Sequence, residues 1–361
     1  MLYNLLRPLA DQSIAFNLFR YLTFRSGAAC ITALVLSLLL GPMLIRWLKS
    51  VQGSGQPIRP DGPETHFAKK GTPTMGGVLI LSTLCVSTLL WADLRNGYVW
   101  AVMLLTLCYG ALGFVDDYIK LLKSNHKGIS ARGKLIWQLL GGLAAAAWIA
   151  WLTKGALGTG VTIPVFKEVL IPLGFAFPIF GMLVMLGFSN AVNLTDGLDG
   201  LAIVPTIIAA GVMALIAYLV GNRIFADYLQ LNFVPAVGEL CVFLSALVGA
   251  GLGFLWFNAP PAAVFMGDTG ALALGGALGA VSVAIKHEIV LAIVGGLFVV
   301  ELASSLIQVF WFKRTGKRVF LMAPLQHHFE KKGWSEPTIV IRFWIIAMIL
   351  ALIGLATLKI R

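Results

Sequence analysis

Apolar segments close to the length of a membrane-spanning helix recur along almost the whole chain, and no other feature constrains the fold as strongly. Roughly 20 apolar residues cross a bilayer as a helix, and the sequence offers about ten such segments. They lie near residues 24–47, 78–94, 98–118, 134–153, 170–190, 200–220, 237–256, 270–286, 289–312 and 340–358. Only 12% of the residues are charged, against about a quarter in soluble domains. The sequence predicts an all-α, polytopic integral membrane protein with one domain over residues 1–361, and it excludes a soluble globular enzyme.

Some segments need a separate interpretation. The eighth span is short, and its Gly-rich run Ala273–Gly279 suits close helix packing more than contact with lipid. Arg7 and Arg20 interrupt the N-terminal segment, which lacks a small-residue cleavage site, so we expect a short interfacial helix and no removable signal peptide. A small hairpin is expected within residues 155–168. The four cysteines lie in apolar runs and are interpreted as buried small side chains: Cys30, Cys85, Cys108 and Cys241.

Positive charge is concentrated in alternate connections between the spans. Of the 27 Lys and Arg residues, 17 fall in the connections at residues 46–77, 119–134, 191–199, 257–269 and 313–342. Because basic residues favour cytoplasmic loops, these connections are predicted to face the cytoplasm and both termini to face the periplasm. The net charge of +11 could also indicate nucleic-acid binding, but its distribution is that of a membrane protein. No nucleic-acid partner is expected.

Two adjacent carboxylates, Asp116 and Asp117, end the third span where the helix meets the cytoplasmic interface. Anions are disfavoured at a helix C-terminus, and charged residues are rare at membrane depth. The pair therefore predicts a bound cation or a proton-transfer task. The alternative interpretation is a solvated helix end.

Two further connections combine acidic residues with glycine. Between spans five and six, polar groups recur at three-residue spacing, which could gather them on one face for a ligand or simply form a turn that caps the next helix. The members of this run are Asn193, Asp196, Gly197, Leu198, Asp199 and Gly200. Asp268 precedes the eighth span, where it could cap the helix or serve Mg²⁺ or phosphate chemistry; Asn258 lies in the same connection.

The first and last cytoplasmic connections supply possible phosphate ligands. Lys69 and Lys70 lie near glycines, with Thr72 and Thr74 as additional donors, which suits a phosphate or diphosphate. His327 and His328 could donate to a phosphate or titrate, although an interfacial histidine pair is more often without such a role. Together, the five connections indicate metal-assisted chemistry on a phosphorylated, water-soluble substrate. The membrane would supply a second, lipid substrate.

Five segments resemble the motifs of the polyprenyl-phosphate N-acetylhexosamine-1-phosphate transferase superfamily and, within it, of the bacterial phospho-N-acetylmuramoyl-pentapeptide-transferase family. The segments are GTPTMGG from Gly71, FVDDY from Phe114, NLTDGLDG from Asn193, FMGD from Phe265 and APLQHHFE from Ala323. The acidic motifs mark the superfamily. The last motif and the RFW sequence at Arg342 mark the muramoyl branch.

This resemblance implies transfer of phospho-MurNAc-pentapeptide from UDP-MurNAc-pentapeptide to undecaprenyl phosphate in the bacterial cytoplasmic membrane, with release of UMP and formation of lipid I. It implies Mg²⁺ bound by Asp268, deprotonation of the lipid phosphate by Asp116, and support for both from Asp117. The 193–199 run matches the nucleotide-side loop. Other positions would line the substrate pocket: Phe265 near uracil, with Lys69, Gln308 and the catalytic candidate His327.

One position departs from the family pattern of three consecutive histidines, because the first is Gln326 here. Glutamine can still donate a hydrogen bond to phosphate, so we expect activity to survive. Direct attack by the lipid phosphate is favoured over a covalent intermediate on Asp116 or Asp117, which the sequence leaves open. The alternatives are a transferase that uses UDP-GlcNAc and a multi-pass transporter. Small-residue faces on the spans would permit a homodimer.

Overall fold

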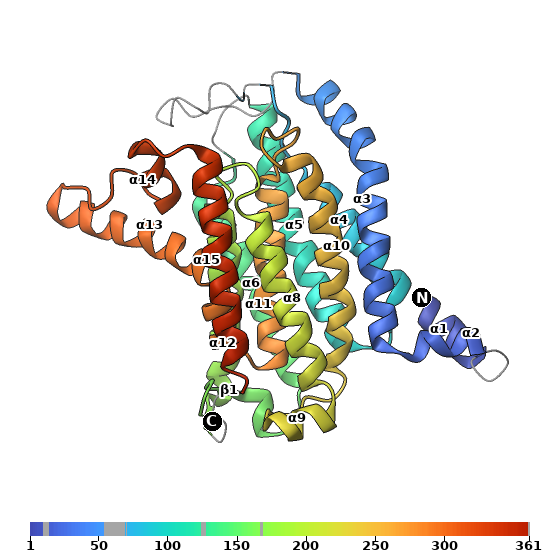
Figure 1. The fold of residues 1–361 in the computed structure, drawn as a ribbon. Coiled ribbons are helices and arrows are strands. Elements are labelled where there is room, and N and C mark those ends of the chain that lie inside the picture. The colour runs from blue at the N-terminus through green and yellow to red at the C-terminus, as the bar shows by residue number, and fades with distance from the viewer. Residues whose placement is uncertain (10–13, 54–68, 70, 124–127, 167–168, 360–361) are drawn as a thin grey trace.

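The computed structural model describes the chain except for residues 10–13, 54–68, 70, 124–127, 167–168 and 360–361. Its long helices lie roughly side by side in one bundle (Figure 1). The helices of the bundle are α3 (Leu22–Gln52), α4 (Gly77–Trp91), α5 (Gly97–Leu122), α6 (Ala131–Leu152), α7 (Phe177–Thr195), α8 (Ile203–Val220), α10 (Leu240–Asn258), α11 (Gly267–Ile285), α12 (Glu288–Val294) and α15 (Glu336–Ala356). A further helix, α13 (Gly296–Thr315), projects from the bundle.

Each expected span overlaps at least one helix. Within the described residues, nine helices are long and apolar enough to cross a membrane. The tenth, α4, has 15 residues and therefore a length of about 22 Å, which is less than the roughly 30 Å of a bilayer core. The bundle can accept this short helix because α4 packs against α3, α10 and α11. A helix held by its neighbours does not have to match the full thickness of the lipid.

The prediction of one continuous ninth span is wrong. The helix is interrupted at Gly295, where α12 ends and α13 begins, and α13 leaves the bundle sideways (Figure 1). The fifth span also differs, because residues 170–172 form a strand and α7 begins only at Phe177. Gly174, with φ +53°, supplies the left-handed backbone that separates this strand from the helix.

The Gly-rich helix α11 lies at the centre of the bundle. Of its most apolar stretch, 94% is buried, whereas the other candidate spans range from 22% to 61%. A Cβ atom on Gly275 would lie 2.3 Å from the carbonyl oxygen of Phe188 on α7, and one on Gly276 would lie 2.5 Å from the Tyr109 ring on α5. The expected close packing is confirmed, since only glycine admits such approaches.

Several small elements lie toward the end of the bundle near the termini (Figure 1). Strand β1 (Gly160–Thr162) pairs antiparallel with β2 (Leu170–Pro172), so a hairpin exists but its second strand lies just beyond the expected stretch. Short helices α1 (Leu2–Leu6) and α2 (Ile14–Asn17) form the N-terminal segment, and α9 (Arg223–Leu229) follows α8. The four cysteines are free but half-buried, not buried as expected, because they lie on the flanks of their helices.

Candidate active site

Three carboxylates from two helices meet at the end of the bundle opposite the termini. Ligand oxygens of Asp116, Asp117 and Asp268 all lie within 4.8 Å of one another. Glycine makes this meeting possible, because a Cβ on Gly113 of α5 would lie only 2.2 Å from the Asp268 carbonyl oxygen at the start of α11. Asp116 and Asp117 are almost fully buried, whereas the Asp268 side chain keeps 16% exposure.

The first turn of α11 is capped by a residue from another helix. The Oδ2 atom of Asp117 accepts hydrogen bonds from the Thr269 amide at 3.0 Å and the Thr269 hydroxyl at 2.8 Å. Asp268 lies inside the helix, which begins at Gly267, so the interpretation of Asp268 as the cap is wrong. Because Asp117 satisfies the free amides of this turn, the Asp268 carboxylate can point elsewhere.

Two lysines that the sequence interpretation missed join Asp116 to Asp268. Lys120 Nζ lies 2.7 Å from Asp116 Oδ2 and 3.0 Å from Asp268 Oδ2. Lys134 Nζ lies 2.8 Å and 2.7 Å from the same two atoms. The signal for Lys120 was its position four residues after Asp116 on one helix, which places the two side chains on one face.

The oxygen donors of this cluster suit a divalent cation. Three carboxylates converge, and Asn193 Nδ2 donates to Asp268 Oδ1 at 2.8 Å, which orients that carboxylate. Mg²⁺ prefers oxygen ligands and is often bound by one or two carboxylates with phosphate oxygens of a substrate. Three carboxylates and two lysines leave one formal negative charge that a cation can balance. Asp116, Asp117 and Asp268 therefore fit Mg²⁺.

The loop after α7 lies beside this cluster, and its residues Asp196 and Leu198 have different environments. Burial, together with the negative charges of Asp268 and Asp117, raises the pKa of Asp196 to about 8. This shift favours the protonated form of Asp196, which can donate a hydrogen bond, more than for an ordinary aspartate. Leu198 instead packs into an apolar cluster with Leu201 and Ile339, so its side chain supports the loop from beneath.

Three predicted ligands are engaged in holding the chain together. Lys69 Nζ lies 2.7 Å from Asp199 Oδ1 and also pairs with Glu336. Asn258 Oδ1 accepts from the Gly200 amide at 3.0 Å, which ties the loop to α10. The structure therefore brings Lys69, Asp199 and Asn258 together beside the site, with Lys69 in ion pairs.

A short helix, α14 (Leu325–Lys331), covers the loop after α7. A Cβ on Gly197 would lie 3.1 Å from His327 Nε2 and 2.9 Å from the Gln326 side-chain nitrogen, so the glycine admits the helix. His327 Nδ1 lies 2.6 Å from a Glu330 carboxylate oxygen, a partner that the sequence interpretation missed. Gln326 is fully buried and donates to the Leu194 carbonyl at 3.0 Å.

The remaining predicted residues lie in supporting positions. Gln308 Oε1 accepts from the amides of Val319 and Phe320, and His328 Nδ1 accepts from the Leu321 amide at 3.1 Å. Both therefore hold the 319–321 segment, and no contact joins them to the carboxylates among the described residues.

Segment 73–77 pairs with the residues before α11. The Phe265 amide donates to the Pro73 carbonyl at 2.8 Å, and the Phe265 carbonyl accepts from the Gly76 amide at 2.8 Å. This pairing brings Thr74 to the start of α11, where its hydroxyl lies 2.7 Å from the Cβ position of Gly267. Lys70 lies outside the described residues.

Known proteins match this chain over its whole length. The model of glycosyl transferase family 4 matches residues 99–286, which include helices α5 to α11, and phospho-N-acetylmuramoyl-pentapeptide-transferase signature 1 matches residues 69–81. A phospho-N-acetylmuramoyl-pentapeptide-transferase of Granulibacter bethesdensis is 75% identical over 100% of both chains. The chain belongs to this family. Enzymes of the same name from Gluconacetobacter diazotrophicus and Gluconobacter oxydans are each 65% identical over 100% of both chains.

Family membership confirms the resemblance that the sequence motifs carry. The signature at residues 69–81 covers Lys69, Thr74 and the segment that pairs with Phe265. The model of family 4 covers Asp116, Asp117 and Asp268. Both matches therefore fall on the elements that build the carboxylate cluster.

Proposed function

We propose that the chain transfers phospho-N-acetylmuramoyl-pentapeptide from UDP-MurNAc-pentapeptide to undecaprenyl phosphate, releasing UMP and forming lipid I. The observation that carries this proposal is the cluster of Asp116, Asp117 and Asp268 with Lys120 and Lys134, in a chain of this family. The cluster combines anionic ligands for a metal with cations for phosphate oxygens. Transfer of a phosphoryl group between two anionic substrates requires both.

Asp268 is the proposed Mg²⁺ ligand, assisted by Asp117 and Asp116. When bound, Mg²⁺ would neutralise diphosphate charge and stabilise the UMP leaving group. Lys120 and Lys134 would turn from the carboxylates toward phosphate oxygens as the anionic substrates enter, because each Nζ already lies at the mouth of the cluster with about a quarter of its side chain exposed. Asp117 would keep the first turn of α11 in place through Thr269.

The proposed chemical step is a direct displacement. A phosphate oxygen of undecaprenyl phosphate attacks the phosphorus next to the sugar, a new P–O bond forms, and the bond to UMP breaks. Asp116 would accept the proton of the lipid phosphate, since its carboxylate projects from α5, six residues before the helix ends at Leu122, into the cluster that would bind the phosphates. Capture of a radiolabelled sugar-phosphate on the protein, without lipid acceptor, would instead establish a covalent route through a carboxylate.

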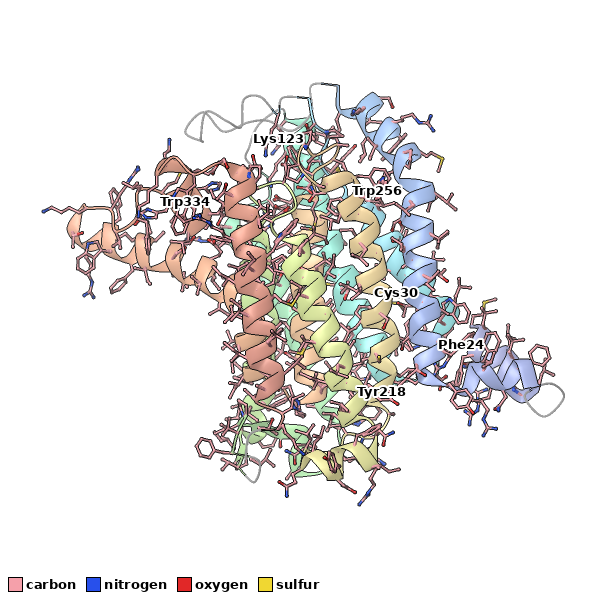
Figure 2. All side chains as sticks on the ribbon, viewed as in Figure 1. Phe24, Cys30, Lys123, Tyr218, Trp256 and Trp334 are labelled. Carbon is pink, nitrogen blue, oxygen red and sulfur yellow. The ribbon has the colours of Figure 1, made fainter. Side chains whose placement is uncertain are left out.

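We further propose that the site faces the cytoplasm of a bacterium with the protein in the inner membrane. The carboxylate cluster lies at the end that holds Lys123 and Trp334, whereas the chain termini lie toward the other end (Figures 1 and 2). UDP-linked substrates are water-soluble, so the site must open to the compartment that contains them. The predominance of basic residues at this end supports the same assignment.

Release of UMP by the purified protein tests the proposal. Undecaprenyl phosphate and Mg²⁺ would be supplied with either UDP-MurNAc-pentapeptide or UDP-GlcNAc, and each reaction would be repeated with a chelator. We expect UMP only with the muramoyl substrate and without chelator. UMP from UDP-GlcNAc would assign the chain to a different sugar, and turnover in chelator would remove the metal from the mechanism.

A further inference from the structure

An apolar groove lies between α13 and α15 on the side from which α13 projects. Its cavity of about 230 Å³ is lined by Gly296, Leu297, Val300, Leu325, Phe329, Trp334, Arg342, Phe343, Ile346 and Leu350. Val300 and Ile346 are 49% and 43% exposed, so the groove opens on the outer face of the bundle. Apolar cavities of about 150 Å³ already bind small hydrocarbons, so this groove has room for a stretch of alkyl chain.

The mouth of the groove is aromatic and cationic. Phe329 and Trp334 stack with ring centroids 4.5 Å apart and close one end of the groove. The Arg342 guanidinium lies 4.3 Å from the Trp334 ring centroid, and Lys332 Nζ lies 5.9 Å from that of Phe329. Within the described part of the chain, no carboxylate lies at ion-pair distance from either cation. Both positive charges are therefore available to an external anion.

An apolar groove next to two cationic side chains suits an amphiphile that has an alkyl chain and an anionic headgroup. We propose that the groove binds an anionic phospholipid of the surrounding bilayer, with one acyl chain between α13 and α15 and the phosphate at Arg342 and Lys332. This site is separate from the carboxylate cluster, whose cations are Lys120 and Lys134. The acceptor lipid must bring its phosphate to that cluster, so a resident phospholipid fits the groove better.

Such a lipid would brace α14. Leu325 and Phe329 line the groove, and the same short helix presents His327 to Gly197. A lipid in the groove would hold α14 against the loop after α7, because the acyl chain would make apolar contacts with Leu325 and Phe329 of α14. The inference does not depend on which sugar nucleotide the site uses.

Quenching of Trp334 fluorescence tests the inference. The protein would be placed in nanodiscs of phosphatidylcholine with increasing amounts of phosphatidylglycerol carrying brominated acyl chains, and brominated phosphatidylcholine would serve as the reference. Subtracting the signal of Trp334→Phe isolates this indole among the ten tryptophans. We expect Trp334 to be quenched at a lower mole fraction of brominated phosphatidylglycerol than of brominated phosphatidylcholine.

Removal of the cations should abolish the preference. The double substitution Lys332→Gln with Arg342→Gln should raise the half-quenching fraction of phosphatidylglycerol by about tenfold or more, since each membrane-proximal cation contributes to anionic-lipid binding. The matched control is Lys313→Gln with Lys317→Gln, which removes one exposed cation from the last turn of α13 and one just beyond the helix, and should leave the half-quenching fraction unchanged.

Two outcomes would overturn the inference, and both can be measured on the unsubstituted protein should the double variant fail to fold. Equal quenching by the two brominated lipids would mean contact with bulk lipid only. Displacement of brominated phosphatidylglycerol by equimolar undecaprenyl phosphate would assign the groove to the acceptor lipid.

Discussion

Among single residues, Asp268 should show the largest effect on turnover. Asp268→Asn keeps the shape of the side chain but removes the charge that Lys120, Lys134 and a divalent cation would share. We expect UMP release to fall about a thousandfold, equivalent to about 4 kcal/mol of transition-state stabilisation. Asp227→Asn, on exposed α9, is the matched control and should retain full activity. Near-normal turnover in Asp268→Asn, with both variants unfolding at the temperature of the parent, would remove Asp268 from the site.

Gln326 provides a second prediction at this scale. Its side chain is buried and donates to the Leu194 carbonyl, so it positions α14 and does not reach the carboxylates. A histidine in its place can also donate one hydrogen bond. Gln326→His should therefore change the rate of UMP release by less than about tenfold, because the lost and gained hydrogen bonds are similar in strength. A larger gain would show that a histidine at this position takes part in the chemistry.

At the residue scale, the aspartates of the cluster can be predicted from the sequence, but their lysine partners cannot. The Asp pair and Asp268 could be found because carboxylates at span ends are costly and need a compensating partner. Lys120 and Lys134 were interpreted only as topology signals, since cytoplasmic lysines are common and the sequence does not show that α5 and α6 converge on Asp268. The cap of α11 by Asp117 was equally out of reach, because it joins residues 152 positions apart.

At the scale of elements, the contact between α14 and the loop after α7 should determine activity. Gly197→Ala would place a methyl group 2.9 Å from the Gln326 side-chain nitrogen and 3.1 Å from His327 Nε2, so the ends of these two α14 side chains must shift. We expect UMP release to fall about tenfold or more, because catalytic groups lose their positions with small displacements. The control is Gly187→Ala on α7, where no neighbour lies within 4 Å. Equal activity in the two variants would mean that α14 is dispensable for catalysis.

Hydropathy predicted where the helices lie in the sequence, but it did not predict the direction in which each helix runs. Each expected span is largely helical because long apolar runs have few other stable forms in a membrane. The break at Gly295 left no trace in hydropathy, since apolar residues continue on both sides of it, yet it directs α13 out of the bundle. The central place of α11 was foreseeable from Gly275, Gly276 and their neighbours, which suit helix contacts and not lipid.

At the scale of the whole molecule, the prediction of which side of the membrane holds the site rests on the alternation of basic connections. Lys123 and Trp334, which belong to two connections rich in Lys and Arg, lie at one end of the bundle, and the β1–β2 hairpin lies at the opposite end (Figures 1 and 2). The short α12 and the projecting α13 replace one expected span. We predict that α12 and α13 together make a single pass, as the expected span would.

Cysteine labelling tests this topology in full. Lys123→Cys, Lys154→Cys and Lys317→Cys each replace an exposed lysine in a connection, and the native cysteines lie within helices of the bundle. With a membrane-impermeant maleimide, we expect positions 123 and 317 to react from the cytoplasmic side and position 154 from the periplasmic side. The unsubstituted chain gives the background from the native cysteines. Labelling of 123 and 154 from one side would mean that α6 does not cross the membrane, and labelling of 317 with 154 would show that α12 and α13 together fail to make one pass.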